Sequence, residues 1–190
     1  DYVKVDDHNM VVVLGDVMGK KWGAWYFAVA YAGYVRSATR FAVESTNKLS
    51  AGEILQSVNK SIYKDERLSE VFVTLSIIVL SKKENKALYS GAGDLPIFLK
   101  RGDEVNMVKS DGLLLGFNEA REYKDHEIYL NKNDALYLIP DGIIESRNPE
   151  MDGPFGKDKL MFVIEKTPVE NDPIEKIKRE FTELDRKSTR

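Results

Sequence analysis

The sequence contains no cysteine, which excludes disulfides, thiolate metal sites and cysteine nucleophiles. Its only two histidines, His8 and His126, both stand next to acidic residues, so neither a histidine metal cluster nor a histidine-led catalytic triad is expected. No apolar run is long enough to cross a bilayer, and we expect neither a membrane segment nor a signal peptide. The chemistry must therefore come mainly from carboxylates, backbone groups, serine or lysine, and a cytoplasmic location is expected.

An excess of charge of one sign is also missing. The 28 Lys and Arg residues nearly balance the 31 Asp and Glu residues, for a net charge of −3, and the two signs are mixed along the chain. Nucleic-acid binders usually show a strongly basic face, so no nucleic-acid partner is expected. The length of 190 residues with 43% hydrophobic residues predicts one domain over residues 1–190 with a sizeable core.

Apolar periodicity predicts helices near both ends of the chain and strands between them. Ser50, with Glu53 three residues later, predicts the capped start of the second helix. Helices are expected over residues 22–45, 51–67, 157–165 and 173–186, and strands over residues 10–14, 72–80, 87–90, 95–100, 105–108, 122–130 and 135–139. This order predicts an α+β fold with helices packed on antiparallel sheets, rather than alternating βαβ units.

Two aspartates follow predicted buried strands: Asp16 after residues 10–14, and Asp141 after residues 135–139. A carboxylate held at such a position costs several kcal/mol unless it is paired, and Mg²⁺ or Mn²⁺ is a natural partner for oxygen ligands. Gly-Asp and Asp-Gly pairs are also common turns. A structural or sensory domain without metal, in which both pairs are only turns, therefore stays open at this point.

Six segments in order along the chain carry a resemblance to the SpoIIE-type phosphatases. They are residues 15–20 (Gly-Asp-Val-Met-Gly-Lys), 72–75 (Phe-Val-Thr-Leu), 90–93 with Pro96 (Ser-Gly-Ala-Gly), 114–116 (Leu-Leu-Gly), 138–148 (Leu-Ile-Pro-Asp-Gly-Ile-Ile-Glu-Ser-Arg-Asn) and 155–156 (Phe-Gly). Each segment alone is weak, but together they span almost the whole chain. The sequence therefore resembles a metal-dependent serine/threonine phosphatase of the PPM, or protein phosphatase 2C, type.

The resemblance implies a fold, an activity and a cofactor. The fold is the protein phosphatase 2C-like sandwich of two antiparallel sheets flanked by helices. The activity is hydrolysis of phosphoserine or phosphothreonine on a partner protein, by direct attack of an activated water on phosphorus and without a phosphoenzyme. The cofactor is Mn²⁺ or Mg²⁺, with two ions expected in the complete domain.

The resemblance also implies site residues. Asp16 resembles the aspartate that bridges both metals, and the carbonyl of Val17 stands where a main-chain ligand is expected. Asp141, with Gly142, resembles the metal-binding Asp-Gly pair. Asp1 resembles the aspartate that reaches the second metal directly or through water. Asp6 and Asp7 are alternatives to Asp1, but their spacing predicts a hairpin turn.

The sequence departs from the family pattern at both ends. The family's fourth acidic ligand lies in a C-terminal strand that is absent here, and Asp185 stands in a charged helical context that favours a surface position. The usual first strand is also missing, so we expect a domain truncated at both ends. The missing ligand motivates an alternative function, a catalytically impaired phosphatase-fold module that binds a signalling partner.

The resemblance implies partners as well. By family analogy the substrate is a phosphorylated, STAS-like anti-sigma-factor antagonist in a bacterial partner-switching pathway of signal transduction and stress response. Such domains commonly follow a sensory or receiver module, and a homodimer is among the assemblies left open. Lys20 and Lys21 follow the metal motif, where a cation can meet a phosphate, although a solvated lysine pair explains them equally well.

Overall fold

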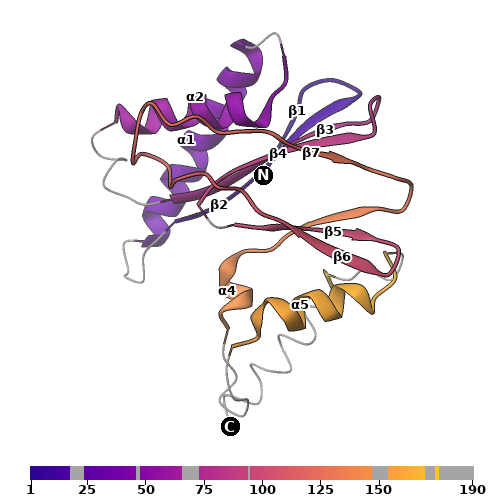
Figure 1. Cartoon of the computed structure of the whole chain (residues 1–190). Coiled ribbons are helices and arrows are strands. Elements are labelled where there is room, and N and C mark those ends of the chain that lie inside the picture. Colours follow the sequence, from indigo (N-terminus) through magenta and orange to yellow (C-terminus); the bar gives the residue numbers. More distant parts are fainter. Residues whose placement is uncertain are drawn as a thin grey trace. The chain divides into compact units, whose positions relative to one another are not determined.

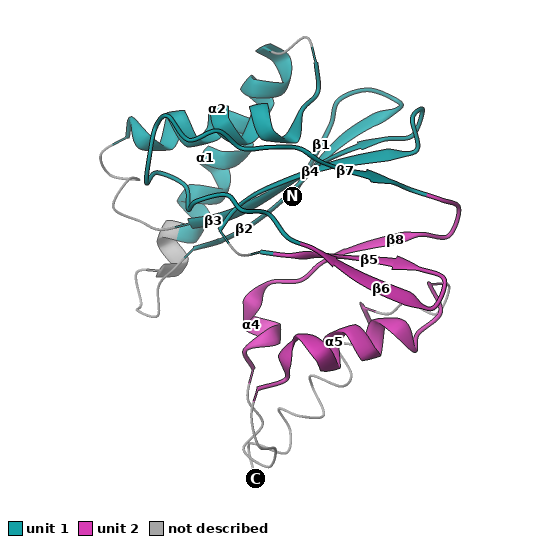
Figure 2. Ribbon diagram, viewed as in Figure 1, with its two compact units in different colours: residues 1–95, 109–130 teal, residues 96–108, 131–190 magenta. Residues whose placement is uncertain are grey.

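The structure is a computed structural model, which describes residues 1–17, 24–45, 48–65, 73–93, 95–146, 154–169 and 174–175. The chain forms two compact units (Figure 2). Unit 1 contains residues 1–95 and 109–130, and unit 2 contains residues 96–108 and 131–190. Each unit is described by itself, with the element labels of Figure 1.

Unit 1 contains a five-stranded antiparallel sheet in the order β1-β2-β3-β4-β7. β2 and β3 pair along their whole length, from Asn9 opposite Ser81 to Val17 opposite Val73. The strands are β1 (Tyr2–Lys4), β2 (Asn9–Val17), β3 (Val73–Ser81), β4 (Lys86–Ala92) and β7 (His126–Tyr129). This pairing fixes which residues share the end of the sheet at which Val17 lies.

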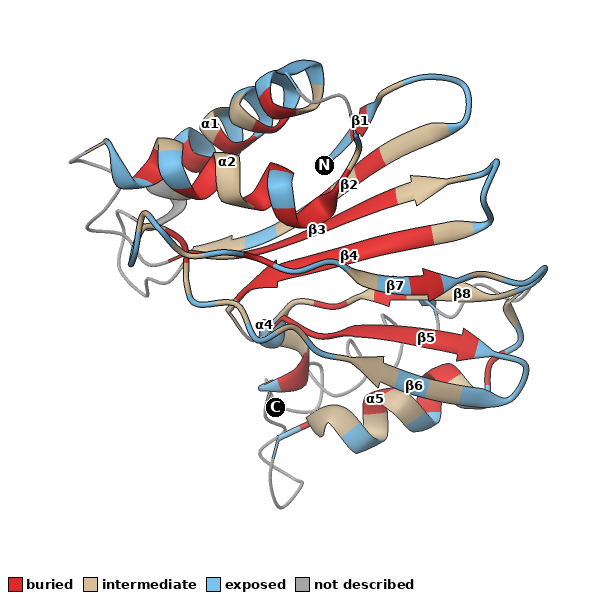
Figure 3. Cartoon of the chain, turned by 45° about the horizontal axis from the view of Figure 1, so that its top comes forward, coloured by how far each residue is buried: buried red, intermediate tan, exposed pale blue. Residues whose placement is uncertain are grey.

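Helices α1 (Ala24–Ser45) and α2 (Ala51–Tyr63) cover one face of this sheet, and their inner sides are buried (Figure 3). On β2, Val11 and Val13 face these helices and belong to the core. Side chains alternate between the two faces of a strand, so Val12, Leu14 and Asp16 project from the opposite face. One face of the valine-rich β2 is thus covered by helices, and Asp16 lies on the other face, which α1 and α2 do not cover.

The start of α2 confirms the predicted cap. Ser50 has extended backbone, and its side chain accepts a hydrogen bond of 3.1 Å from the backbone N–H of Glu53. This bond satisfies one of the N–H groups that the first turn of a helix leaves unpaired. α2 ends at Tyr63, and residues 66–67, which the prediction included, lie outside the described residues.

Unit 2 contains a three-stranded antiparallel sheet in the order β6-β5-β8, with helices α4 and α5. The buried Lys100 of β5 donates hydrogen bonds of 2.7 Å to the carbonyls of Ile164 and Glu165, at the end of α5. The elements are β5 (Ile97–Arg101), β6 (Glu104–Val108), β8 (Ala135–Leu138), α4 (Asp141–Ile144) and α5 (Gly156–Glu165). Lys100 thereby ties the C-terminal end of α5 to the sheet of unit 2.

The predicted α+β class, with antiparallel sheets and helices, is confirmed. Two predicted strands differ from the structure by three residues or more at one end. β2 continues through Asp16 to Val17 instead of ending at residue 14, because these residues pair with β3. β7 covers only His126–Tyr129, not residues 122–130. Asp141, for which the sequence left a turn open as an alternative, begins a short helix, since the N–H of Glu145 donates to its carbonyl at 2.7 Å.

Most of the predicted C-terminal helix, residues 173–186, lies outside the described residues, as do Lys20, Lys21 and Asp185. In the part of the chain that the structure describes, no helix combines the length and the apolarity that a membrane crossing requires.

Candidate metal centre

Asp16 lies one residue before the end of β2, half-buried, opposite Thr74 of β3. The hydroxyl of Thr74 donates a hydrogen bond of 3.4 Å to the backbone carbonyl of Asp16. β3 is a neighbour on the sheet, so the backbone that carries the Asp16 carboxylate is held on a rigid strand rather than on a loop. The side chain projects from the face opposite the helices, as the alternation along β2 requires.

Val17 is the last residue of β2, and the residues that follow it, 18–23, lie outside the described part of the chain. Its predicted role uses only the backbone carbonyl, and its side chain packs against the core of unit 1. Asp16 and Val17 thus supply one carboxylate and one carbonyl at the same strand end, and both are oxygen donors suited to Mg²⁺ or Mn²⁺.

Asp141 and Gly142 belong to unit 2, where they are the first two residues of α4 and are both exposed. The helix begins here because Pro140 is extended and leads directly into it, with a hydrogen bond of 3.2 Å from the N–H of Ile143 to the Pro140 carbonyl. The buried Ile144 anchors α4 in the core of unit 2. The carboxylate of Asp141 is therefore held at a fixed point of that unit and is open to solvent.

Asp1 has a different environment from the one that the sequence predicted. Its backbone pairs with Val13 through two bonds of 2.8 and 2.9 Å, so its side chain shares the helix-covered face with Val13. One carboxylate oxygen accepts a hydrogen bond of 2.8 Å from the N–H of Tyr2, and the other pairs with Arg36 of α1. Asp1 and Asp16 therefore project from opposite faces, and a metal-binding role for Asp1 stays a prediction.

Asp6 and Asp7 form the turn that the sequence predicted. The carboxylate of Asp6 accepts hydrogen bonds from the N–H groups of His8 and Asn9 and from the Asn9 side chain, at 2.7 to 2.8 Å. The bond from the Asn9 side chain is the main reason that the pKa of Asp6 lies below its ordinary value. Asp7 pairs with Lys4. Both carboxylates are thus engaged within the hairpin.

The chemistry of the predicted donors fits a hard divalent ion, because all of them are oxygens. The predicted set is divided between the units, with Asp1, Asp16 and Val17 in unit 1 and Asp141 and Gly142 in unit 2. Among the described residues, no group of three or more His, Cys, Asp or Glu side chains lies together in one place. The described residues of either unit alone therefore do not include a complete set of metal ligands.

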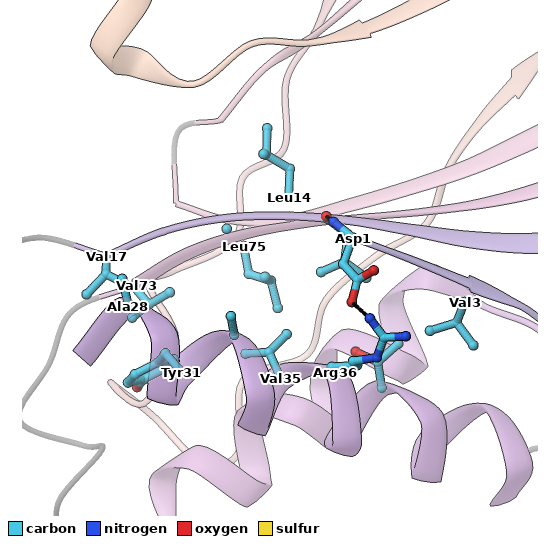
Figure 4. Close-up of a pocket in the computed structure, with 14 residues that line it drawn as sticks. Asp1, Val3, Leu14, Val17, Ala28, Tyr31, Val35, Arg36, Val73 and Leu75 are labelled. Carbon is cyan, nitrogen blue, oxygen red and sulfur yellow. Dashed lines mark hydrogen bonds and ion pairs between the residues drawn. The ribbon is translucent and has the colours of Figure 1, made fainter. Parts of the chain in front are cut away.

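A cavity of about 210 Å³ lies between α1 and the sheet of unit 1 (Figure 4). Its walls are mainly apolar, with Tyr31, Val35 and Leu75 among them, and the Asp1–Arg36 pair stands at one end. Burial raises the pKa of Tyr31 to about 12, so its hydroxyl stays protonated at neutral pH. Thr39 also lines the cavity, and its fully buried hydroxyl has no hydrogen-bond partner among the described residues.

Sequence reasoning missed two residues of unit 1 that make specific contacts, Arg36 and Asn59. Arg36, which holds Asp1, gave no local signal because the pair joins residues far apart in the chain. Asn59 gave a signal that could have been used. It is a polar residue on the apolar side of an amphipathic helix, beside Leu55, Val58 and Ile62, and it is fully buried. Such a residue normally has a specific hydrogen-bonding task.

Comparison with known proteins places the chain in a family. The family model described as Stage II sporulation protein E (SpoIIE) matches residues 6–189. The chain belongs to the SpoIIE family. Among curated relatives, phosphoserine phosphatase RsbU of Bacillus subtilis (strain 168) is 23% identical over 146 residues, which cover 75% of this chain and 41% of RsbU. The chain thus matches less than half of the length of that relative.

Solved structures share the protein phosphatase 2C fold of this SpoIIE-family chain. The SiaA-PP2C domain of Pseudomonas aeruginosa gives a TM-score of 0.81 at 16% identity, over 97% of this chain and 72% of that one. The RsbU and RsbW domains of Rv1364c from Mycobacterium tuberculosis give a TM-score of 0.74 at 21% identity, over 99% of this chain and 50% of that one. RsbX, solved in complex with magnesium, gives a TM-score of 0.61 at 15% identity, over 99% of this chain and 80% of the RsbX chain. The expected fold is confirmed.

Proposed function

We propose that this SpoIIE-family chain hydrolyses phosphoserine or phosphothreonine on a partner protein, with Mn²⁺ or Mg²⁺ as cofactor. The observation that carries the proposal is the rigid placement of Asp16 and Val17 at the end of β2, within a chain whose residues 6–189 match the family model. The name of the relative RsbU, a phosphoserine phosphatase, and the magnesium complex of RsbX support the activity and the cofactor.

In this proposal Asp16, the Val17 carbonyl and Asp141 with Gly142 hold two divalent ions, and Asp1 contributes to the second one. Bound divalent ions activate water and neutralise the charge on a phosphate that undergoes in-line displacement. The role of the protein chain in this proposal is to orient the oxygen donors. β2 fixes Asp16 against Thr74, and α4 fixes Asp141 above the buried Ile144.

The proposed substrate is a phosphorylated anti-sigma-factor antagonist of the STAS type, in a partner-switching pathway with an upstream sensory or receiver module. The family resemblance supports this assignment, as does the chain from Mycobacterium tuberculosis that joins an RsbU to an RsbW domain.

The test measures two quantities on Asp16→Asn and Asp141→Asn: the affinity for Mn²⁺ by calorimetry, and the release of phosphate from p-nitrophenyl phosphate and from a phosphoserine peptide. Each Asn removes a charge at constant shape, so we expect Mn²⁺ affinity to fall at least tenfold and turnover at least a hundredfold. Asp158→Asn is the matched control, since Asp158 is exposed and lies in the first turn of α5.

The outcomes separate the alternatives. Unchanged metal affinity in both variants means that the Asp-Gly pairs are turns and that the metal proposal is wrong. Metal binding without hydrolysis by the wild-type chain, together with retained binding of a phosphoprotein, identifies a binding module instead of an enzyme.

A further inference from the structure

The cavity between α1 and the sheet of unit 1 lies where small residues of both elements face each other. Gly15 of β2 and Ala28 and Ala32 of α1 line it, and none of them has a side chain larger than a methyl group. Gly15 shares the helix-covered face of β2 with Val13, because side chains alternate along a strand. Protein interiors contain few voids larger than a water molecule, so a space of about 210 Å³ beside a core requires an explanation.

The walls of this cavity are apolar and belong to the packed core of unit 1. Tyr31 and Val35 lie one turn apart on the inner side of α1, and Leu75 of β3 lies across from them (Figure 4). All three side chains are buried, so the cavity is pre-formed and an occupant does not have to order them. An engineered apolar cavity of about 150 Å³ in another protein binds benzene. The space here therefore holds one ring with a small substituent.

One polar group in the wall is buried without a partner. Thr39 lies one turn beyond Val35 on α1, lines the cavity and is fully buried. A threonine hydroxyl in a helix often donates to the carbonyl four residues earlier, but the Thr39 hydroxyl has no hydrogen-bond partner among the described residues. Buried polar groups are normally paired, and an unpaired one costs free energy. A hydroxyl group of a molecule in the cavity supplies the missing partner.

The charged groups at one end of the cavity favour an uncharged occupant. The carboxylate of Asp1 and the guanidinium of Arg36 pair with each other there, so their charges cancel (Figure 4). The hydroxyl of Tyr31 adds no charge at neutral pH, because burial raises its pKa to about 12. Arg36 and Ala32 are exposed, so a molecule from solvent reaches the cavity along this edge of α1.

We infer that this cavity binds a small uncharged molecule of the phenol class, with one ring and one hydroxyl group. The ring packs against Tyr31, Val35 and Leu75, and the hydroxyl exchanges a hydrogen bond with that of Thr39. Asp16 projects from the opposite face of β2, so the bound molecule does not touch its carboxylate. The site lies within unit 1 and is independent of the proposed hydrolysis.

The test titrates three probes into the metal-free wild-type chain with isotope-labelled methyl groups. p-Cresol and toluene differ only by the hydroxyl, and p-toluate carries a carboxylate in its place. Methyl chemical shifts give the dissociation constants, and nuclear Overhauser effects from the probe ring to the methyls of Val35 and Leu75 locate the site. For p-cresol we expect a dissociation constant below about 1 mM, within the range of efficient small ligands. We expect p-toluate to bind at least about tenfold more weakly, because burial of its charge is costly.

Three variants test the assigned contacts. Thr39→Val keeps the shape of the side chain and removes its hydroxyl, so p-cresol should bind about three- to tenfold more weakly, while toluene should change by less than about twofold. Ala28→Leu fills the cavity and should abolish the binding of both probes. Ala30→Leu is its matched control, because Ala30 lies on the exposed side of the same helix, and both probes should bind it as they bind the wild type. Circular dichroism and thermal unfolding verify that each variant is folded.

The absence of saturable shifts with p-cresol, or nuclear Overhauser effects to methyls outside the cavity, overturns the inference. Unchanged p-cresol affinity in Thr39→Val also overturns it, because the hydroxyl then does not recognise the ligand. Tighter binding of p-toluate than of p-cresol means that Arg36 leaves Asp1 for an anion, which contradicts the uncharged class. If Ala28→Leu does not fold, the comparison of p-cresol with toluene in Thr39→Val still decides. Since no metal or phosphate is present, failure here is distinct from failure of the proposed activity.

Discussion

The carboxylate of Asp1 pairs with the guanidinium of Arg36 on the face of the five-stranded sheet that α1 covers. Asp16 projects from the opposite face, at the end of β2. If Asp1 contributes to a metal centre with Asp16, its side chain must leave Arg36. The guanidinium and a divalent ion then compete for one carboxylate, and the metal affinity of the chain depends on a residue of α1 that is not itself a ligand.

Replacement of Arg36 by alanine is therefore expected to raise the affinity for Mn²⁺. Both partners of the pair are about half exposed, and such pairs contribute at most about 1 kcal/mol, so the expected gain is about two- to fivefold. Isothermal titration calorimetry measures it. Arg40→Ala, one turn further along α1 and also exposed, is the control and should leave the affinity unchanged. Equal affinity in Arg36→Ala and the wild type would remove Asp1 from the proposed ligand set.

Replacement of Asn59 by alanine should destabilise unit 1 strongly. The change removes two hydrogen bonds of a fully buried side chain and takes the Asn59 partner from the half-buried N–H of Gly116, whereas the exposed carbonyl of Asn118 keeps the N–H of Arg121 at 3.3 Å. We expect the free energy of unfolding to fall by about 1–3 kcal/mol, as seen when a buried polar group loses its partner. Urea unfolding followed by tryptophan fluorescence measures the change. Lys60→Ala, the exposed neighbour on α2, should change it by less than about 0.5 kcal/mol, and a similar loss in both variants would contradict the role of Asn59.

Two buried threonines should respond in opposite directions to replacement by valine. The hydroxyl of Thr39 has no partner among the described residues, so Thr39→Val removes an unpaired polar group and should stabilise the chain by about 1 kcal/mol. The hydroxyl of Thr167 donates to the carbonyl of Val163 at 2.7 Å, so Thr167→Val should destabilise it by about 1 kcal/mol. Differential scanning calorimetry of both variants provides the comparison. A loss of stability in Thr39→Val would show that its hydroxyl is paired in solution.

The sequence was sufficient for those features that depend on neighbours along the chain. The cap at Ser50 and the long strand β3 follow from local periodicity and turn chemistry, and both are present. Features that depend on pairing could not be predicted in this way. The end of β2 at Val17 is set by β3, about sixty residues away, and nothing in the sequence of residues 15–17 shows that this partner exists.

The same limit applies to the candidate site. Local sequence identified Asp16 and Asp141 as carboxylates near strand ends, and the family match supports the motif that contains them. The contact between Asp1 and Arg36 depends on the register of β1 against β2 and on the packing of α1, which no local pattern encodes. Asn59 stood out as a polar residue within an apolar face, but its partners lie in a segment about sixty residues further along.

The ion pair between Asp134 and Arg101 should make unit 2 less stable as the pH falls into the acid range. The nearly buried carboxylate of Asp134 accepts hydrogen bonds from Arg101 at 2.8 and 3.0 Å and from the N–H of Asn131 at 2.8 Å. The bond from Arg101 is the main cause that lowers the pKa of Asp134 below its ordinary value. A carboxyl group with a lower pKa in the folded state stabilises that state above its unfolded pKa of about 3.9, and this contribution disappears as the pH falls through the folded pKa.

The wild-type chain should therefore lose stability between about pH 5 and pH 3 more steeply than Asp134→Asn, which has no titrating group at this position. Thermal midpoints measured at pH 7, 5, 4 and 3 test the expectation, with Asp103→Asn as a control because Asp103 lies exposed on the turn between β5 and β6. The difference between the wild type and Asp134→Asn should be largest at pH 7 and should shrink toward pH 3, whereas the difference for Asp103→Asn should stay small throughout. A constant difference for Asp134→Asn across this range would mean that the hydrogen-bond geometry at this turn, and not the charge of the carboxylate, stabilises unit 2.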